Sequence, residues 1–174
     1  MARRAIFVDA ENVFYSQKQF LHWFFDWEKL LSFLSKGHDV VDRQFFTIKA
    51  TFKDDRISEN RKKFHHFLTT ALHFYVRERE TKTIRLPNGA SFQKSNIDIE
   101  IAIAILTTVN NWDEIVFVGG DSDFAILFQK IRDMGKKVII VSTKETVSYD
   151  LRNVAHEFID LDSIKSHIER VEKK

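Results

Sequence analysis

The chain has 174 residues, of which 44% are hydrophobic and 30% charged, and its formal net charge is only +2. Since one domain usually takes about 100–200 residues, we expect a single domain over residues 1–174, with a core from about 4 to 162 and a C-terminal helix over 163–174. The absence of cysteine excludes disulfides, thiolate catalysis and Cys-ligated zinc or iron–sulfur sites. The longest apolar stretch, Ile101–Leu106, is far shorter than the roughly 20 residues of a membrane span. The apolar run that stops at Asp9 is too short for a secretion signal, so the sequence predicts a cytoplasmic protein without a membrane segment.

Apolar runs typical of strands alternate with segments of helical spacing. Strands are predicted at 5–9, 40–49, 74–79, 115–118, 138–141 and 158–159, and helices at 12–21, 27–34, 57–72 and 124–134. The segment 97–109 fits either period, but a parallel crossover into the strand at 115 requires a helix there. Residues 81–93 read as two short arms around a turn at Pro87-Asn88-Gly89. The alternation predicts an α/β fold with a mostly parallel sheet covered by helices on both faces.

Two of the most apolar predicted strands end in aspartate, one at Asp9 and the other at Asp121. Ligands of open α/β sheets bind at the carboxyl ends of the strands, so these two carboxylates would converge if the strands are neighbours. Asp123 follows in the first turn of the next helix. Carboxylate oxygens without His or Cys are ligands that Mg²⁺ or Mn²⁺ prefers. Asp121, Ser122 or Asp123 could equally be an ordinary helix N-cap, Asp98 another cap, and Asp9 a loop acid, but two acids at two strand ends favour a site.

Asp98 stands at the start of the predicted helix over 97–109. After a simple crossover, the N-terminus of that helix would open on the edge of the sheet opposite to Asp9. The excursion over 81–93 could instead deliver the helix to the same edge, so the residues alone leave the place of Asp98 open.

The middle of the chain is basic. From Arg43 to Lys94 there are twelve lysines and arginines against five acids, a net charge of +7, whereas the remainder carries −5. This asymmetry is typical of a polyanion binder with an acidic metal site, although a solvated helix face and a charged hairpin would give the same count. The candidate contacts to nucleic acid are Arg56, Lys62, Lys63, Lys94 and Ser122.

Aromatic residues are concentrated between positions 14 and 27. They are Phe14, Tyr15, Phe20, Trp23, Phe24, Phe25 and Trp27. An exposed part of this cluster would suit unpaired bases or a second copy of the chain in a homodimer, although core packing is the commoner role.

Three motifs, in this order, carry a resemblance to a known family: Ile6–Asn12 (IFVDAEN), Lys94–Glu100 (KSNIDIE) and Val118–Phe124 (VGGDSDF). Together with the strand that follows at 137–142, they resemble the NYN domain family, LabA-like branch, of the PIN-like nuclease superfamily. The likeness covers about residues 4–162.

The resemblance implies a doubly wound, five- to six-stranded sheet of order 3-2-1-4-5, with Asp9, Asp98, Asp121 and Asp123 around one or two Mg²⁺ or Mn²⁺. It also implies metal-dependent cleavage of single-stranded RNA, with Asn12 orienting the site. One departure is Ala104, where many relatives carry a further acid.

Other functions compete with this one. A catalytically weak RNA-binding or regulatory member of the same family would carry the same motifs, and Ala104 makes it credible. Gly120-Asp121-Ser122 also resembles the late acidic motif of haloacid-dehalogenase-like phosphatases, but Asp9-Ala10-Glu11 lacks the second aspartate of their first motif. A receiver-like regulatory module would explain neither Asp123 nor the basic middle of the chain.

Overall fold

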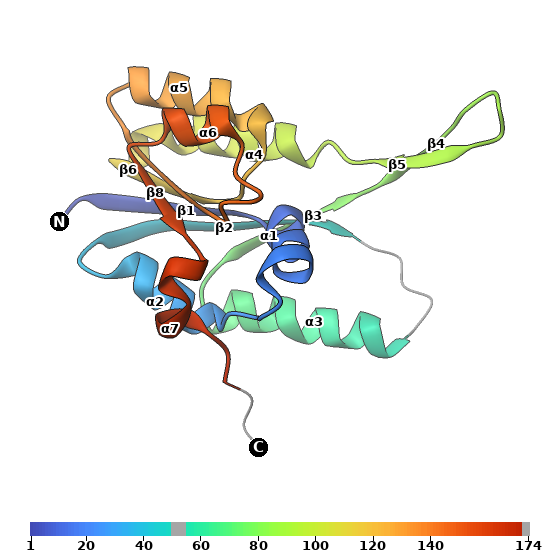
Figure 1. The fold of residues 1–174 in the computed structure, drawn as a ribbon, viewed down its shortest axis with the longest axis horizontal. Coiled ribbons are helices and arrows are strands. Elements are labelled where there is room, and N and C mark those ends of the chain that lie inside the picture. Colours follow the sequence, from blue (N-terminus) through green and yellow to red (C-terminus); the bar gives the residue numbers. More distant parts are fainter. Residues whose placement is uncertain (50–54, 172–174) are drawn as a thin grey trace.

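A six-stranded, fully parallel sheet of order β3-β2-β1-β6-β7-β8 forms the centre of the molecule (Figure 1). The structure, a computed structural model, describes residues 1–49 and 55–171. Its strands are β1 (Arg3–Asp9), β2 (Asp39–Lys49), β3 (Tyr75–Glu80), β6 (Glu114–Val118), β7 (Lys137–Ser142) and β8 (Glu157–Asp160). Numbered within this sheet alone, the order is 3-2-1-4-5-6, so the predicted fold class is confirmed.

Helices cover both faces of the sheet (Figure 1). One face carries α1 (Ala10–Ser16), α2 (Trp27–Ser35), α3 (Asp55–Thr70) and α7 (Lys165–Ile168), and the other carries α4 (Ile97–Thr108), α5 (Ala125–Asp133) and α6 (Tyr149–Val154). None of the helices within the described ranges is long and apolar enough to cross a membrane.

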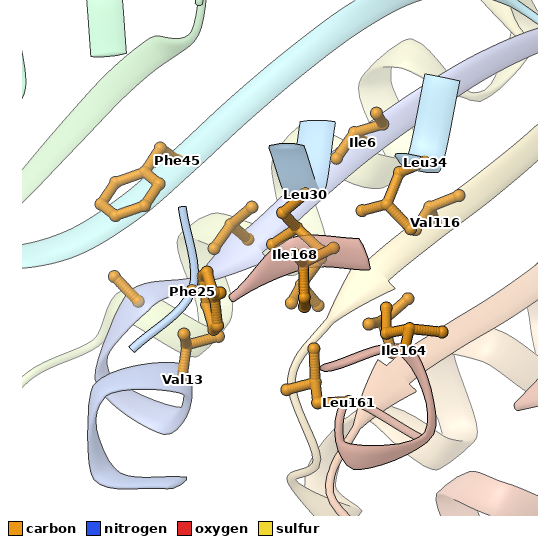
Figure 2. Packing of buried hydrophobic residues seen from close by; sticks show 14 of the residues in the cluster. Ile6, Val13, Phe25, Leu30, Leu34, Phe45, Val116, Leu161, Ile164 and Ile168 are labelled. Carbon is orange, nitrogen blue, oxygen red and sulfur yellow. The ribbon is translucent and has the colours of Figure 1, made fainter. Parts of the chain in front are cut away.

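Alternate residues of the buried strands feed two separate cores. In β1, Ile6 and Val8 join the core under α1, α2, α3 and α7, whereas Ala5 and Phe7 join the core under α4, α5 and α6. Figure 2 shows the first core, in which Leu30 and Ile168 approach the strands from their helices. A strand buried on both faces must be apolar at every position, which is why the chain reads as short uninterrupted apolar runs.

A two-stranded antiparallel hairpin, β4 (Lys82–Arg85) and β5 (Ser91–Lys94), projects from the body of the molecule (Figure 1). Its turn contains Gly89, whose φ of +83° favours glycine. The hairpin follows the carboxyl end of β3 and leads into α4, which runs back along the sheet to β6. The helix predicted over 97–109 is therefore confirmed, and its first turn lies at the edge where β1 and β6 end.

Two parts of the chain differ from the sequence prediction. The helix predicted over 163–174 is wrong for most of its length, because only Lys165–Ile168 is α-helical, after a 3₁₀ turn. Beyond it the chain is extended and pairs with the loop before α2, where the N–H of Arg170 donates to the carbonyl of Phe24 at 2.9 Å. Residues 172–174 of that prediction lie outside the described part of the chain. The segment 17–21 continues α1 as a π-helix.

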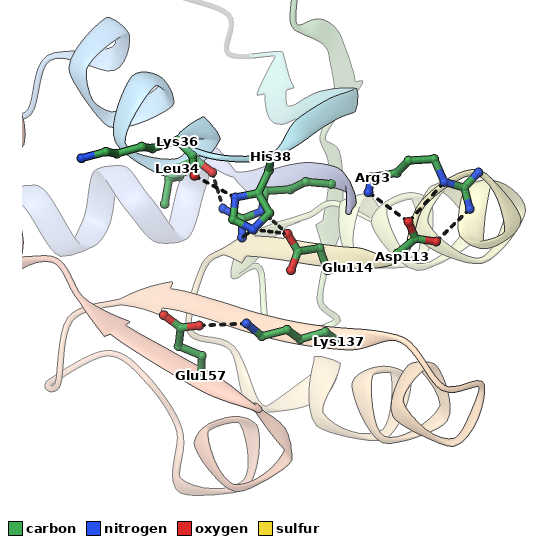
Figure 3. A network of polar contacts seen from close by, with 9 residues as sticks. Arg3, Leu34, Lys36, His38, Asp113, Glu114, Lys137 and Glu157 are labelled. Carbon is green, nitrogen blue, oxygen red and sulfur yellow. Dashed lines mark hydrogen bonds and ion pairs between the residues drawn. The ribbon is translucent and has the colours of Figure 1, made fainter. Parts of the chain in front are cut away.

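Ion pairs join neighbouring strands at the amino edge of the sheet (Figure 3). The pairs are Arg3 with Asp113 (2.8 Å), Arg4 with Glu114 (2.7 Å) and Lys137 with Glu157 (3.2 Å). The second pair is buried, and its residues face each other in the register of β1 and β6. His38 lies 3.0 Å from the same carboxylate, and the guanidinium of Arg4 also donates to the carbonyl of Leu34. Opposite charges therefore hold the strand beginnings in register.

Candidate metal and nucleic-acid site

The strand order reverses between β1 and β6. From β1 the chain proceeds through α1 and α2 to β2 on one side, whereas β6 leads through α5 to β7 on the other. Val8 of β1 pairs with Val118 of β6, so the residues that come next, Asp9 and Gly119, are neighbours at the ends of the two strands. A Cβ placed on Gly119 would lie 3.3 Å from the Cβ of Asp9. In open α/β sheets this reversal point is where ligands bind.

The aspartates singled out by the sequence come together at this edge. Burial raises the pKa of Asp9 to about 7, and the charges of Asp98, Glu11 and Asp121 push it in the same direction. The pKa of Asp98 is also raised, first by burial and then by the charges of Asp121 and Asp123. Asp9 is only 5% exposed, Asp98 and Asp121 are half-buried, and Asp123 is exposed. The charges of Asp98 and Asp121 therefore act on Asp9, and those of Asp121 and Asp123 act on Asp98, so the four carboxylates share one electrostatic environment.

Two of these aspartates also cap helices. Oδ1 of Asp9 accepts the backbone N–H of Asn12 at 3.3 Å, and Oδ1 of Asp121 accepts that of Asp123 at 3.0 Å. The N-cap of α4, by contrast, is Asn96, so Asp98 has no capping role. Capping and a ligand site are compatible here, because each cap engages one oxygen of the carboxylate.

The loop after β7 links the two sides of the site, a feature that the sequence analysis missed. The hydroxyl of Thr146 contacts those of Ser16 and Ser142, both at 3.0 Å, and the Ser16 hydroxyl donates to the carbonyl of Asn12 at 2.8 Å. On the other side, Gly120 lies so close to this loop that a Cβ would come within 2.5 Å of the Thr146 carbonyl oxygen. The sequence feature that could have indicated this close approach is the pair Gly119-Gly120 before Asp121.

The donor set suits a hard divalent cation. Within residues 1–49 and 55–171, no three His, Cys, Asp or Glu side chains lie close enough together to form a ready-made metal group. Mg²⁺ does not need one, because it keeps several waters and binds through one or two carboxylates together with substrate phosphate. Oδ1 of Asn12 is buried and has no hydrogen-bond partner among the described residues, which leaves an oxygen donor beside Asp9. The residues present therefore fit Mg²⁺ or Mn²⁺.

The predicted nucleic-acid contacts lie in different places. Ser122 is exposed between Asp121 and Asp123. Lys62 and Lys63 are exposed on α3, which covers the face of the sheet opposite to α4 and α5 (Figure 1). Arg56 is in the first turn of α3, and Lys94 ends β5 opposite Lys82. The structure thus brings Ser122 to the aspartates and leaves the two lysines of α3 on the other face.

The aromatic cluster is divided between core and surface. Trp23 and Phe25 are buried, whereas Tyr15 is 56% and Phe24 63% exposed. Core packing explains the buried part, and the homodimer stays a prediction.

Comparisons with known proteins identify the family of this chain and show a known structure of the same fold. Residues 3–162 match the family model of the NYN domain. The chain is similar to the low amplitude and bright protein LabA of Synechococcus elongatus, with 32% identity over 176 residues that cover 99% of this chain and 90% of that protein. It is also 32% identical over 82 residues to an uncharacterised protein of Methanocaldococcus jannaschii, which covers 45% of this chain and 34% of that protein. A crystal structure of a Vibrio parahaemolyticus protein of unknown function has the same fold, with a TM-score of 0.79 and 23% identity over 97% of this chain and 96% of that one.

Proposed function

Because this chain belongs to the NYN domain family of the PIN-like nuclease superfamily, we propose that it is a metal-dependent endoribonuclease that hydrolyses single-stranded RNA in the cytoplasm. The observation that supports this proposal is the gathering of Asp9, Asp98, Asp121 and Asp123 at the point where the strand order reverses. Carboxylates that repel one another in a half-buried site are typical of a site whose charge is balanced by a ligand.

The four aspartates would hold one or two Mg²⁺ or Mn²⁺, with Asn12 as a neutral oxygen donor or an orienting group. When bound, the ion supplies Lewis-acid chemistry by balancing the negative charge of the phosphate. The side chains of the site would position the RNA backbone and a water molecule.

Asp9 would act as a ligand of the ion, because it is the most buried of the four aspartates, at 5% exposure, and stands at the end of β1. The N–H of Asn12 donates to Oδ1, so Oδ2 is the oxygen left to hold the ion. The oxygen of the attacking water would form a bond to phosphorus while the bond from phosphorus to the leaving ribose oxygen breaks. The proton of the attacking water would pass to solvent, and a solvent water would protonate the leaving oxygen.

A second candidate is an RNA-binding or regulatory protein of the same family without appreciable turnover. Ala104 favours it, since this position is 3% exposed and packs in the core under α4, where a further carboxylate would be buried. The haloacid-dehalogenase-like phosphatase has no comparable support, because the family match includes the strand ends on which that alternative depended.

Incubation of the purified protein with labelled single-stranded RNA and DNA, in Mn²⁺, in Mg²⁺ and in chelator, tests the proposal. We expect RNA cleavage with either ion and none in chelator. Asp9→Asn should lower kcat on the order of 100-fold, because a carboxylate ligand of the ion is lost and electrostatic stabilisation of the reaction is weakened. The matched control is Asp26→Asn, because Asp26 caps α2 through the N–H groups of Glu28 and Lys29 just as Asp9 caps α1.

Cleavage that survives both chelator and Asp9→Asn would refute this mechanism. RNA binding without cleavage under every condition would favour the second candidate.

A further inference from the structure

A groove lies between α4 and α5, directly beside the aspartates. Its volume is about 550 Å³, within the range of about 300–1,000 Å³ of small-ligand sites. The two helices run in the same direction, because each leads from the carboxyl edge of the sheet to the next strand. Asp98 in the first turn of α4 and Asp123 in the 3₁₀ turn that precedes α5 line the groove at that end. Leu106 and Lys130 line it about two turns further on.

The walls of this groove are apolar and exposed to solvent. Ile99 on α4 is 60% exposed and Ile126 on α5 is 82% exposed, with Leu106 at 43%. Exposed aliphatic residues are ordinary when scattered, but here three of them face one hollow. Ile103 is as exposed as Ile99, at 56%, yet it does not line this groove.

A second hollow of about 340 Å³ continues the groove beyond Asn96. It is lined by Arg79 and Glu80 of β3, by Lys82 and Ile84 of the hairpin, and by Asn96, which also lines the groove between α4 and α5. Arg79 pairs with Glu100 of α4 at 2.8 Å, and this pair ties β3 to the first turn of α4. The side chain of Asn96 makes no capping hydrogen bond, although it stands at the N-cap of α4. The surface therefore passes from cationic groups over a polar amide and the aspartates to an apolar groove that ends near a lysine.

We propose that the groove between α4 and α5 binds one unstacked base of a single-stranded RNA, next to the phosphate held at the aspartates. This inference rests on the proposed function, because the divalent ion held by the aspartates would fix where the phosphate lies. The apolar walls contact the faces of the base, Lys130 neutralises the following phosphate, and the strand leaves across Asn96 towards Arg79 and Lys82. A base within a duplex has its faces covered by its neighbours, so this groove selects single strands.

Short RNAs in which one abasic nucleotide is moved through every position test this directly. Binding is measured by fluorescence anisotropy with Asp9→Asn in Mg²⁺, so that turnover does not interfere. We expect one position at which base removal weakens binding about tenfold, within the range for stacking of a single base. Ile99→Ala or Ile126→Ala, each added to that protein, should weaken binding of the intact RNA and abolish the further loss at the same position. Ile103→Ala, the matched control on α4, should leave both values unchanged.

An equal loss of RNA affinity at every abasic position would overturn the proposal. So would a loss of affinity on base removal that stays the same size in the protein that also carries Ile99→Ala. It is also overturned if Ile99→Ala changes the sedimentation mass and leaves RNA binding intact, because a second copy of the chain would then occupy the groove. If the wild-type protein cleaves RNA but no abasic position weakens binding, only this inference is refuted. If one abasic position weakens binding but the wild-type protein does not cleave RNA, only the nuclease function is refuted.

Discussion

Asp9 offers the sharpest test of the site, because its ionisation opposes folding. Its pKa rises from 3.8 to about 7, mainly through burial and then through the charges of Asp98, Glu11 and Asp121. A folded-state pKa above the unfolded one means that the native protein binds the proton more tightly. Ionisation of Asp9 therefore lowers the free energy of unfolding. The decrease reaches its full size once the pH exceeds the folded-state pKa.

The cost follows from the size of the shift. A rise of about three pKa units, at about 1.4 kcal/mol each, gives about 4 kcal/mol at pH 8. The cost falls as the pH drops and is below about 1 kcal/mol near pH 4, where the unfolded chain also binds the proton. Asp9→Asn removes it, while the amide oxygen still accepts the N–H of Asn12. For a domain of this size we expect Tm to rise by about 10 °C at pH 8 and hardly at all at pH 4.

Thermal melts of wild type, Asp9→Asn and Asp26→Asn in chelator, from pH 4 to pH 8.5, measure this difference. Mn²⁺ should raise the Tm of the wild type, because the ion binds the folded site and hardly the unfolded chain, and should raise that of Asp9→Asn less. Asp26→Asn should show no comparable pH dependence. If Asp9→Asn raises Tm by the same amount at pH 4 and pH 8, or lowers Tm at both, the electrostatic reasoning is refuted.

Two further substitutions test how the strand ends are built. Gly119→Ala should destabilise the protein by about 1–3 kcal/mol in urea, because its Cβ would lie 2.8 Å from the ring of Phe117 and 3.3 Å from the Cβ of Asp9; an unchanged midpoint would contradict this. Glu114→Gln should lower the free energy of unfolding by about 3–5 kcal/mol, because it leaves the buried charge of Arg4 without its charged partner at 2.7 Å. A decrease below about 1 kcal/mol would show that the pair contributes little to stability.

The fold could be predicted because the central strands β1, β6 and β7 are buried on both faces and the helices α2, α3 and α5 are amphipathic. The apolar run Ile115–Val118, for example, pairs on both sides within the sheet. The helix over 97–109 needed topology as well as periodicity, because its isoleucines suit both periods. The short helix α6 and the end of the chain were beyond prediction, since six or four residues carry little periodicity. They are held by contacts distant in sequence, such as the N–H of Ser148 on the carbonyl of Gly120.

The site could be predicted in part because the apolar runs of the strands also mark where the strands end. Asp9 and Asp121 follow apolar runs, so their position at strand ends could be read from the chain. The place of Asp98 depended on the path of the hairpin, which spacing does not reveal. The net charge of the basic middle could not show that Lys62 and Lys63 lie on α3, across the sheet from α4 and α5. The burial of the Asn12 side-chain oxygen depends on packing that no local pattern encodes.

The two ends of β1 and β6 differ in what their charges do. At the amino end, Arg4 and Glu114 attract each other and hold the register, whereas at the carboxyl end Asp9 and Asp121 repel each other. Selection can therefore act on the two ends separately. A neutral residue at position 9 that still accepts the N–H of Asn12 would relieve the repulsion and leave the pair of Arg4 with Glu114 intact. The charge at the carboxyl edge of the sheet can therefore change without any change in the alignment of β1 and β6.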